Sequence, residues 1–263
     1  MEVHAHSHTA RKKWTHYFWE FLMLFLAVFC GFLAEYQLEH KIEKERARKY
    51  MYDMVENLKY DTIRYNRNLV NNETIGKQLD SLRAEISYAV KGQINGNRLY
   101  ELWLKCSDFN SVVFNRTAIT QLKNSGSFRL IENDVMSLSI SDYYERKISA
   151  CEAQEEKLSR SNERLSISSA RFFYYEPFDQ MLSTETTFKE QTSVSIISRN
   201  NKILNSNPPL TLLNNNPADL KLLYNDVAIN ENNMKEYNAY LRWARETAIA
   251  LMKEIVKEYH FKK

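Results

Sequence analysis

Three histidines alternate near the N-terminus, at His4, His6 and His8. In an extended tail this spacing directs the three imidazoles to one side, because side chains of an extended chain alternate between two faces. Imidazole binds zinc, nickel and copper, so the three residues could form a weak metal site, with His16 as a fourth ligand. The alternative is a solvated tail whose histidines only titrate near neutral pH. The sequence predicts no other cofactor site.

Cys106 and Cys151 are the thiols outside the most apolar stretch of the chain. In an oxidising compartment they could form a disulfide, provided that their α-carbons come within about 7 Å. The other interpretation is two separate buried thiols, and the sequence favours it because cysteine is an ordinary core residue.

The sequence lacks the motifs of the common enzyme classes. It contains no HExxH, CxxC, GxSxG, GxxxxGK[ST] or GxGxxG. Asp53, Glu56 and Asp61 share a predicted helix, where a solvated face is favoured over an acid/base pair. The 36 Lys and Arg residues nearly balance the 33 Asp and Glu residues, which argues against a dedicated nucleic-acid binder. We therefore predict a protein that is not an enzyme and binds no nucleic acid.

The glycine and proline content indicates an all-α fold. Only 5 of 263 residues are glycine, and the first of four prolines is Pro177. Long stretches therefore contain no residue that must break a helix.

Residues 14–34 are apolar apart from Glu20, and as a helix they would span about 30 Å, the thickness of the hydrocarbon core of a bilayer. Aromatic residues flank the run, as is typical of membrane interfaces: Trp14, Tyr17, Trp19 and Tyr36. Glu20 can pair with His16 four residues earlier. This pattern predicts one transmembrane helix, with membrane lipid as its surroundings.

A cleaved signal sequence is the main alternative to a retained anchor. Cleavage after Ala34 would place bulky Phe32 where a small residue is required, and Phe29 occupies the corresponding position before Cys30 of a lipoprotein signal. A retained anchor is therefore favoured.

The charges that flank the anchor give conflicting indications of its orientation. Arg11, Lys12 and Lys13 directly precede the anchor, and a larger number of basic residues follows it at a distance: Lys41, Lys44, Arg46, Arg48 and Lys49. We expect a cytoplasmic N-terminus and a periplasmic C-terminal domain.

The predicted organisation is a short tail (1–13), the transmembrane helix (14–34), a charged helical stalk (35–50) and an elongated antiparallel helical bundle (51–263). The helix from 35 is expected to reach residue 90, with its weakest point at Asn71, Asn72 and Gly76. A second long helix is predicted from a cap at Asn133 to Tyr174, and a third covers the C-terminal region. Residues 183–216 read as an irregular excursion that includes a hairpin through Val194, Ile196, Ile203 and Leu204.

Two sets of residues are candidates for protein contacts. Ala27 and Gly31 would permit close approach of a second transmembrane helix. Aromatic residues near the end of the second long helix could bind a partner or plug the end of the bundle, and the plug is favoured; they are Phe172, Phe173, Tyr175 and Phe178.

The N-terminal block His4-Ala5-His6-Ser7-His8-Thr9, which leads into RKKWTHYFWEFLMLFLAVFCGFLAE, resembles the start of an uncharacterised family of bacterial single-span membrane proteins. Two later segments are similar to related membrane proteins: Tyr52-x-x-x-Glu56-x-Leu58-x-x-Asp61, and Leu122-x-x-Ser125-Gly126-x-x-Arg129-Leu130-Ile131-x-Asn133 followed by Tyr143-Tyr144. The resemblance implies a location in the bacterial inner membrane and carries no catalytic residue.

We expect a membrane-anchored scaffold or interaction subunit, with a protein partner or a second copy of the chain. A ligand-sensing bundle that signals through a partner protein is the alternative, and an unrecognised membrane-bound hydrolase is a third. A closed apolar cavity would favour sensing, an exposed aromatic patch on a solid core would favour a scaffold, and convergent buried carboxylates would favour a hydrolase.

Overall fold

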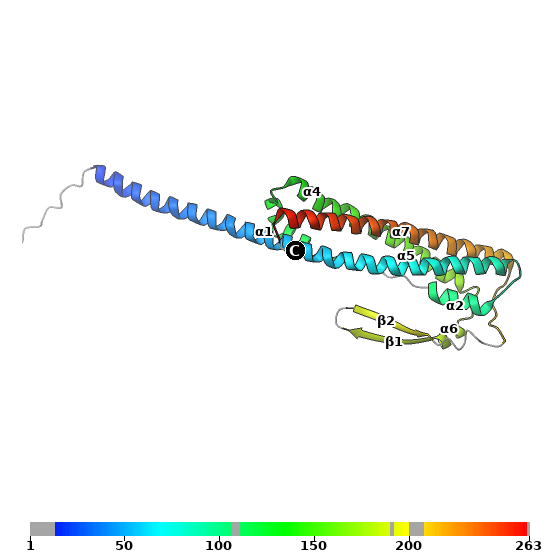
Figure 1. Ribbon diagram of the computed structural model, residues 1–263. Helices are drawn as coiled ribbons and strands as arrows, with labels where there is room; N and C mark the ends of the chain where they lie inside the picture. Colours follow the sequence, from blue (N-terminus) through cyan, green and yellow to red (C-terminus); the bar gives the residue numbers. More distant parts are fainter. Residues whose placement is uncertain (1–13, 107–110, 190–191, 200–207, 262–263) are drawn as a thin grey trace, which may run out of the picture.

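The computed structural model describes residues 14–106, 111–189, 192–199 and 208–261, and for residues 180–199 it describes the backbone alone. Three long helices form the body of the molecule: α1 (Trp14–Val90), α5 (Ile148–Ser169) and α7 (Pro217–Glu258). α7 runs antiparallel to the other two and packs against both (Figure 1). The fold is therefore an all-α bundle, as the glycine and proline content predicts.

Shorter elements complete the bundle. α2 (Gly96–Cys106), α3 (Thr117–Asn124) and the 3-10 turn η1 (Ser127–Leu130) pack against α1. α4 (Asp134–Ser141) and the π-helical turn η2 (Asp142–Lys147) lead into α5. α6 (Glu176–Met181) and the strands β1 (Leu182–Lys189) and β2 (Thr192–Arg199) form a side excursion before α7.

Apolar stripes on α1 and α7 form most of the core. α1 buries Met51, Leu58, Tyr65, Leu79 and Leu82, and α7 buries a matching series at three- and four-residue steps: Met234, Tyr237, Leu241, Ala244, Ala248, Leu251 and Ile255. Each large apolar side chain contributes about 1.5–3 kcal/mol when it is fully removed from water. The predicted stripe of the C-terminal helix is confirmed, and α1 supplies the surface that it covers.

α1 is continuous through Asn71, Asn72 and Gly76, the likeliest weak point of the helix that the sequence predicts up to residue 90. The reason is tertiary. The Asn72 side chain is buried and donates a hydrogen bond to Asn238 Oδ1 of α7 at 2.9 Å. Contact with α7 thus stabilises a helical segment whose own propensity is modest.

The second long helix begins as predicted and ends earlier than expected. The side chain of Asn133 caps α4 by accepting a hydrogen bond from Met136 N at 3.1 Å. The helical path then passes through η2 and ends with α5 at Ser169 rather than at Tyr174. Phe172 N donates to Ser169 O at 2.8 Å, and this turn directs Phe172 and Phe173 into the core.

The predicted excursion contains an antiparallel hairpin, in which Leu182 pairs with Arg199 and Lys189 with Thr192. Val194 and Ile196 lie on β2 as expected, but their partner strand is β1. Ile203 and Leu204 lie outside the described residues. The β1 sequence contains several threonines, which favour extended backbone once a turn brings two segments together.

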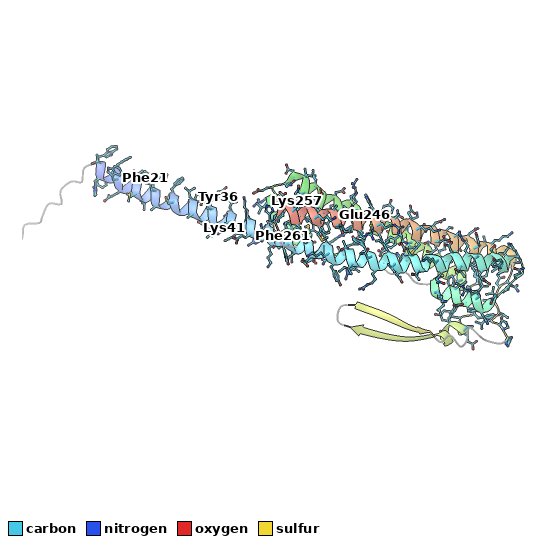
Figure 2. All side chains as sticks on the ribbon, viewed as in Figure 1. Phe21, Tyr36, Lys41, Glu246, Lys257 and Phe261 are labelled. Atoms are coloured by element: carbon cyan, nitrogen blue, oxygen red, sulfur yellow. The ribbon has the colours of Figure 1, made fainter. Side chains whose placement is uncertain are left out.

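α1 is much longer than the bundle, so its N-terminal part projects alone (Figure 1). Ala47 is the first buried residue of α1, and residues 14–46 would extend about 50 Å beyond it. Figure 2 shows Phe21, Tyr36 and Lys41 on this uncovered part. One segment within the projection is long and apolar enough to cross a membrane, and none of it is buried in the molecule.

The base of the bundle determines the direction in which α1 leaves it. Lys44 Nζ pairs with Glu132 at 2.8 Å, and Arg129 pairs with Glu43 at 3.4 Å. After α7 ends, the Phe261 ring packs edge-on against Tyr52 of α1, with ring centroids 5.4 Å apart. These contacts join both the α3–α4 connection and the C-terminal segment to the point where α1 emerges.

The far end of the bundle closes around Gly96 at the start of α2. Asn97 Oδ1 accepts a hydrogen bond from Leu210 N at 2.7 Å, which holds the returning chain against α2. A Cβ atom on Gly96 would lie only 1.7 Å from Leu210 O. A side chain at this position therefore requires a backbone shift.

We expect Gly96→Ala to lower the free energy of unfolding by about 1–3 kcal/mol, because the added methyl group overlaps a carbonyl that the hydrogen bond to Asn97 holds in place. Gly76→Ala is the matched control. A Cβ at Gly76 meets no atom within 4 Å, so alanine in this helix should raise the stability by up to about 1 kcal/mol. Denaturant unfolding of the purified full-length protein measures both values, and equal effects of the two variants would contradict the close approach.

Candidate interaction surface

The projecting part of α1 presents its apolar and aromatic side chains outward. Trp14 and Trp19 are both exposed, and His16 Nε2 lies 3.1 Å from Glu20 Oε1, as the four-residue spacing predicts. Ala27 and Gly31 also lie on uncovered surface, and a Cβ at Gly31 would meet no atom within 4 Å. The two small residues are thus sterically available to a second helix.

A stripe of exposed large apolar residues runs along α1 from the projecting part to the middle of the bundle. It consists of Leu38, Ile42, Tyr52, Tyr60, Ile63 and Val70, whose exposed fractions range from 44% to 66%. At about 100° of rotation per residue, these six positions fall on one face of the helix about 80° wide. We call this surface the outer stripe.

The outer stripe faces away from the core. Ala47, Met51, Met54 and Leu58, which enter the bundle, lie on the opposite side of α1. α1 therefore carries large apolar side chains on two opposite faces over this length, and on the outer face charged residues lie between them. The bundle covers one of them, and the other meets solvent. Exposed apolar surface with charged edges is typical of protein interaction sites.

Charged side chains lie among the apolar residues of the outer stripe as well as beside them, because at about 100° per residue four exposed charged residues fall on the same face: Glu45, Lys49, Glu56 and Arg67. Lys59 Nζ pairs with Glu56 at 2.6 Å, and the Arg64 guanidinium lies over the Tyr60 ring at 4.4 Å from its centroid. Arg64 also donates a hydrogen bond to Val113 O at 2.5 Å. Tyr60 is thus oriented by a residue that is itself tied to the α2–α3 connection, which gives this part of the stripe a defined shape.

Behind the outer stripe, the core contains a polar layer centred on Asp61. Both carboxylate oxygens of Asp61 accept from Asn115 N at 3.3 Å, and the side chain is fully buried. The Tyr65 and Tyr143 hydroxyls lie 2.8 Å apart, in a hydrogen bond that either can donate. Among the described residues, the neighbouring Tyr144 hydroxyl is buried without a partner.

η2 places the two tyrosines in this layer. The wider π-helical turn directs the consecutive residues Tyr143 and Tyr144 both into the core, and their rings meet edge to face at 4.9 Å. Such turns are often found at functional sites. Here the turn serves at least to fill the space between α1 and α7.

A second carboxylate, that of Glu155, binds the same α2–α3 connection that Asp61 binds. Glu155 Oε2 accepts from Tyr237 Oη at 2.6 Å and from Val112 N at 3.3 Å. Asp61 and Glu155 therefore each bind a backbone amide of the segment 111–116. These hydrogen bonds give both carboxylates a structural role, which accounts for the burial of Asp61 and the partial burial of Glu155. Neither residue lines the groove between α5 and α7 described below.

Burial raises the pKa of Asp61 to about 7, although the Asn115 hydrogen bond and the nearby Arg64 charge oppose the shift. Burial also raises the pKa values of Tyr65 and Tyr143 above that of exposed tyrosine, so both stay protonated. Asp61 is thus the group of this layer that changes charge near neutral pH.

The thiols do not form the disulfide that the sequence left open. Cys106 and Cys151 are both buried and not bonded to each other. Cys151 Sγ instead donates to Tyr240 O at 3.4 Å, and burial raises its pKa to about 12, which makes a reactive thiolate unfavourable.

The aromatic residues after α5 mostly plug the far end of the bundle. Phe172, Phe173 and Phe178 are buried, and Phe173 lies 4.9 Å from Tyr100 and 5.5 Å from Trp103 between ring centroids. Tyr175 is the exposed member of the four candidates, so this cluster offers little free surface to a partner.

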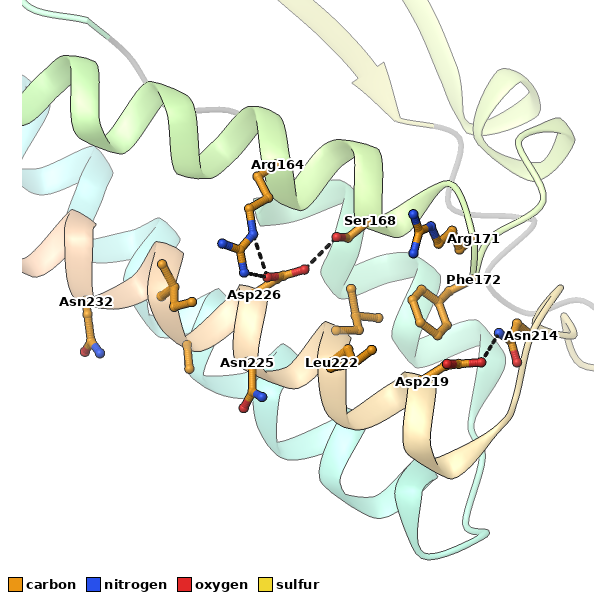
Figure 3. A pocket seen from close by; sticks show the side chains of 13 residues that line it. Arg164, Ser168, Arg171, Phe172, Asn214, Asp219, Leu222, Asn225, Asp226 and Asn232 are labelled. Carbon is orange, nitrogen blue, oxygen red and sulfur yellow. Dashed lines mark hydrogen bonds and ion pairs between the residues drawn. The ribbon is translucent and has the colours of Figure 1, made fainter.

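A groove of about 710 Å³ lies between the end of α5 and the start of α7. Figure 3 shows Arg164, Ser168 and Asp226 on one wall, joined to one another. Arg164 Nε donates to Asp226 Oδ1 at 2.9 Å, and Ser168 Oγ donates to Asp226 Oδ2 at 2.6 Å. The groove opens to solvent, and the charged groups of Arg164 and Asp226 on this wall bind each other. The groove therefore differs from a closed apolar cavity of the kind that binds a small ligand.

His4, His6 and His8 lie outside the described residues. Within residues 14–106, 111–189, 192–199 and 208–261, no cluster of three or more His, Cys, Asp or Glu side chains is arranged to hold a metal ion.

The sequence interpretation missed the outer stripe and the burial of Asp61. A signal for the stripe exists, since Leu38 and Ile42 interrupt a charged segment at a four-residue step. Tyr52, Ile63 and Val70 also do not coincide with the predicted core positions of this helix, such as Met51 and Leu69. Asp61 lies within the same helix and carries no comparable signal.

Asp61 should make the stability of the protein depend on pH. Its pKa of about 7 in the folded protein lies above that of an unfolded aspartate near 4, so the folded state holds the proton more tightly. Its stabilising contribution is complete below about pH 4 and is lost as the pH rises towards 7. Asp61→Asn should therefore reduce the loss of stability between pH 5 and pH 8 by about 2–3 kcal/mol.

Denaturant unfolding of the full-length protein in detergent at several pH values measures this difference. Glu56→Gln, which alters an exposed carboxylate on the same helix, should leave the pH profile nearly unchanged. An Asp61→Asn profile that parallels that of the unaltered protein would contradict the assignment of the proton to Asp61.

No protein-family model matches this chain. No curated protein and no solved structure matches it either. The resemblance of its N-terminal block to a family of bacterial membrane proteins therefore stays a prediction, and function has to be inferred from the residues and geometry of the chain itself.

Proposed function

We propose that the protein is a membrane-anchored interaction subunit, in which residues 14–34 span the bilayer once and the bundle presents α1 to a protein partner. The outer stripe is the observation that supports this function best. It places six exposed apolar side chains on one face of the helix that leads out of the apolar segment. A partner that covers them would gain the free energy of removing them from water.

The continuity of α1 suits this role. Residues 35–46 would hold the base of the bundle about 18 Å beyond the hydrocarbon core, and the helix that crosses the bilayer is the helix that carries the outer stripe. The contacts of Lys44 and Phe261 at the base join this helix to the rest of the bundle. A docked partner would therefore be held at a defined height above the membrane.

The core and the far groove favour binding of a protein over binding of a small ligand. The groove between α5 and α7 is open, and the arginine, serine and aspartate on one of its walls bind one another. The alternative, a ligand-sensing bundle, would place its ligand in this groove. Asp61 and Glu155 each bind backbone amides, so neither supports a hydrolase.

We further propose that the membrane is the bacterial inner membrane and that the bundle is periplasmic. The resemblance of the N-terminal block supports the first point, and the basic residues Arg11, Lys12 and Lys13 beside the apolar segment support the second.

A C-terminal fusion to a reporter that is active only outside the cytoplasm tests the orientation. We expect an active reporter in intact cells, because a long domain is translocated largely regardless of its own charge. A fusion that is inactive, while the matching cytoplasmic reporter is active, would reverse the orientation.

Ile63 provides the test of docking. A photoreactive residue at Tyr60 should form adducts with a partner in membranes of cells that contain the full-length protein. Ile63→Asp should reduce these adducts by about tenfold or more, since burial of one such side chain is worth about 1.5–3 kcal/mol. Ile167→Asp, an equally exposed position on α5, should have no effect.

The same membranes give the control for anchoring. Deletion of residues 14–34 should move the protein from the membrane to the aqueous fraction. Full-length protein in the aqueous fraction would refute the anchor. Adducts that Ile63→Asp leaves unchanged would refute the docking surface.

A further inference from the structure

We propose that residues 111–116, which lead into α3, form a strap over Asp61 that stays closed while Asp61 is protonated and detaches from α1 when Asp61 ionises. Detachment removes a contact that orients part of the outer stripe, so a partner docks more strongly on the acidic side of neutral pH. The effect on docking rests on the interaction function proposed above, whereas the strap itself does not.

Side chains hold the backbone of the strap in place. Val112 N donates to Glu155 Oε2 at 3.3 Å, and Asn115 N donates to both carboxylate oxygens of Asp61 at 3.3 Å. Between them, Val113 O accepts from Arg64 at 2.5 Å. In the part of the chain that the structure describes, no backbone–backbone hydrogen bond holds residues 111–115. The charges of a few side chains therefore decide how firmly the strap is attached.

The closed strap suits the neutral form of Asp61. A carboxylate can accept about four hydrogen bonds, yet the two oxygens of this fully buried group share one N–H. The distance of 3.3 Å also exceeds the 2.7–2.9 Å that is typical of charge-assisted hydrogen bonds. One long hydrogen bond returns less free energy than the desolvation of an ion costs.

The charge of Arg64 does not offset this cost. It acts on Asp61 and opposes the rise of its pKa, but the guanidinium binds Val113 O and lies over the Tyr60 ring. Burial therefore prevails and raises the pKa of Asp61 to about 7. The closed state holds the proton more tightly than a hydrated carboxyl does, so protonation favours closure and ionisation favours opening.

The strap offers the ionised carboxylate the shortest route to water. Val113 is 68% exposed and Asn115 is half-buried, so the strap lies at the surface of the bundle. Phe114 packs on the Tyr65 ring from the same side, with ring centroids 5.9 Å apart. Lifting these residues hydrates Asp61 without separating α1 from α7.

Other titratable groups around Asp61 are buried or paired. Burial raises the pKa values of the tyrosines on α1 and η2, so Tyr65, Tyr143 and Tyr144 stay protonated. The groups that the neighbouring elements present to this region are Arg116 of the strap, which pairs with Glu152 of α5; Glu155 of α5, which accepts from Tyr237 of α7; Cys151 of α5, whose pKa burial raises to about 12; Arg245 of α7, which donates to Asn66; and Lys123 of α3, which pairs with Glu145.

Arg64 connects the strap to the outer stripe. Its guanidinium lies 4.4 Å from the centroid of the Tyr60 ring while it donates to Val113 O. When the strap detaches, Arg64 loses the acceptor that holds it over Tyr60. This part of the outer stripe then loses the defined shape that a partner would recognise.

Hydrogen exchange of the full-length protein in detergent tests the strap. Peptides that cover residues 111–116 are compared with peptides that cover residues 234–241 of α7, at pH 5.5 and pH 8.5. Exchange times are adjusted for the faster chemical exchange at high pH. Asp61→Asn removes the titrating group, and Glu56→Gln alters an exposed carboxylate on the same helix as the matched control.

We expect protection of the strap peptide to fall by up to about 30-fold at pH 8.5. This is the ratio that proton linkage gives for a pKa of about 7 in the closed state and near 4 in the open state. The α7 peptide should keep its protection. Asp61→Asn should make the protection of the strap independent of pH, whereas Glu56→Gln should behave like the unaltered protein.

Three results would overturn the strap: protection of residues 111–116 that does not change with pH, an equal loss in the α7 peptide, or a loss that persists in Asp61→Asn. The first two are measured on the unaltered protein, so they decide the matter even if the variant does not fold.

A photoreactive residue at Tyr52, which lies on the outer stripe away from the strap, tests the effect on docking. In membranes, adducts with a partner should fall at least about threefold between pH 6 and pH 8.5, and Asp61→Asn should abolish this dependence. Adducts that fall equally in both proteins, or in neither, would overturn the link between strap and docking. Adducts absent at both pH values would overturn the proposed function and this link with it, and would leave the exchange result for the strap as it stands.

Discussion

Contact between α1 and α7 is the interaction on which the rest of the structure depends. α1 is too long and too polar in parts to be stable through propensity alone, and α7 covers one of its faces from Ala47 onward. The α7 stripe of Met234, Tyr237 and Leu241 is buried against α1, and α5 packs against α7 as well. Among the described residues this contact leaves the opposite face of α1 largely exposed, and the outer stripe lies on that face.

Polar groups within the interface have a different role from the apolar stripes. The Asn72–Asn238 hydrogen bond and the Asp61 layer each cost desolvation energy, which well-made hydrogen bonds only partly return. Their geometry can be satisfied in one alignment of the helices, whereas apolar stripes tolerate a shift of one turn. We regard the selection of one alignment of the helices as the physical reason that these polar groups lie in the core. Asp61 adds a dependence on pH to this arrangement, since its charge changes near neutral pH.

A single helix that connects the bilayer to the bundle has mechanical consequences. Residues 35–46 of α1 contain no glycine or proline, and the helix continues without a break into the bundle. Rotation or tilt of the apolar segment would therefore be transmitted to the outer stripe.

Much of the architecture follows from the sequence alone. Scarce glycine and late prolines determine an all-helical class, the apolar run at 14–34 determines one segment suited to a membrane, and Asn133 marks a helix start by its side-chain chemistry. The sequence predicted one strand of the hairpin, because the preference of Val194 and Ile196 for extended backbone is a local property. It did not predict the partner strand Leu182–Lys189, because strand pairing is not a local property.

Tertiary structure decided what local pattern cannot express. α1 stays unbroken at Asn72 because Asn238, distant in sequence, binds its side chain, and Asp61 is buried because the amides of a separate segment satisfy its oxygens. Tyr52, Ile63 and Val70 are surface residues only because α7 covers the other face of α1. Periodicity along one helix shows where apolar side chains recur, and the position of a second helix in space decides which of them are covered and which are exposed.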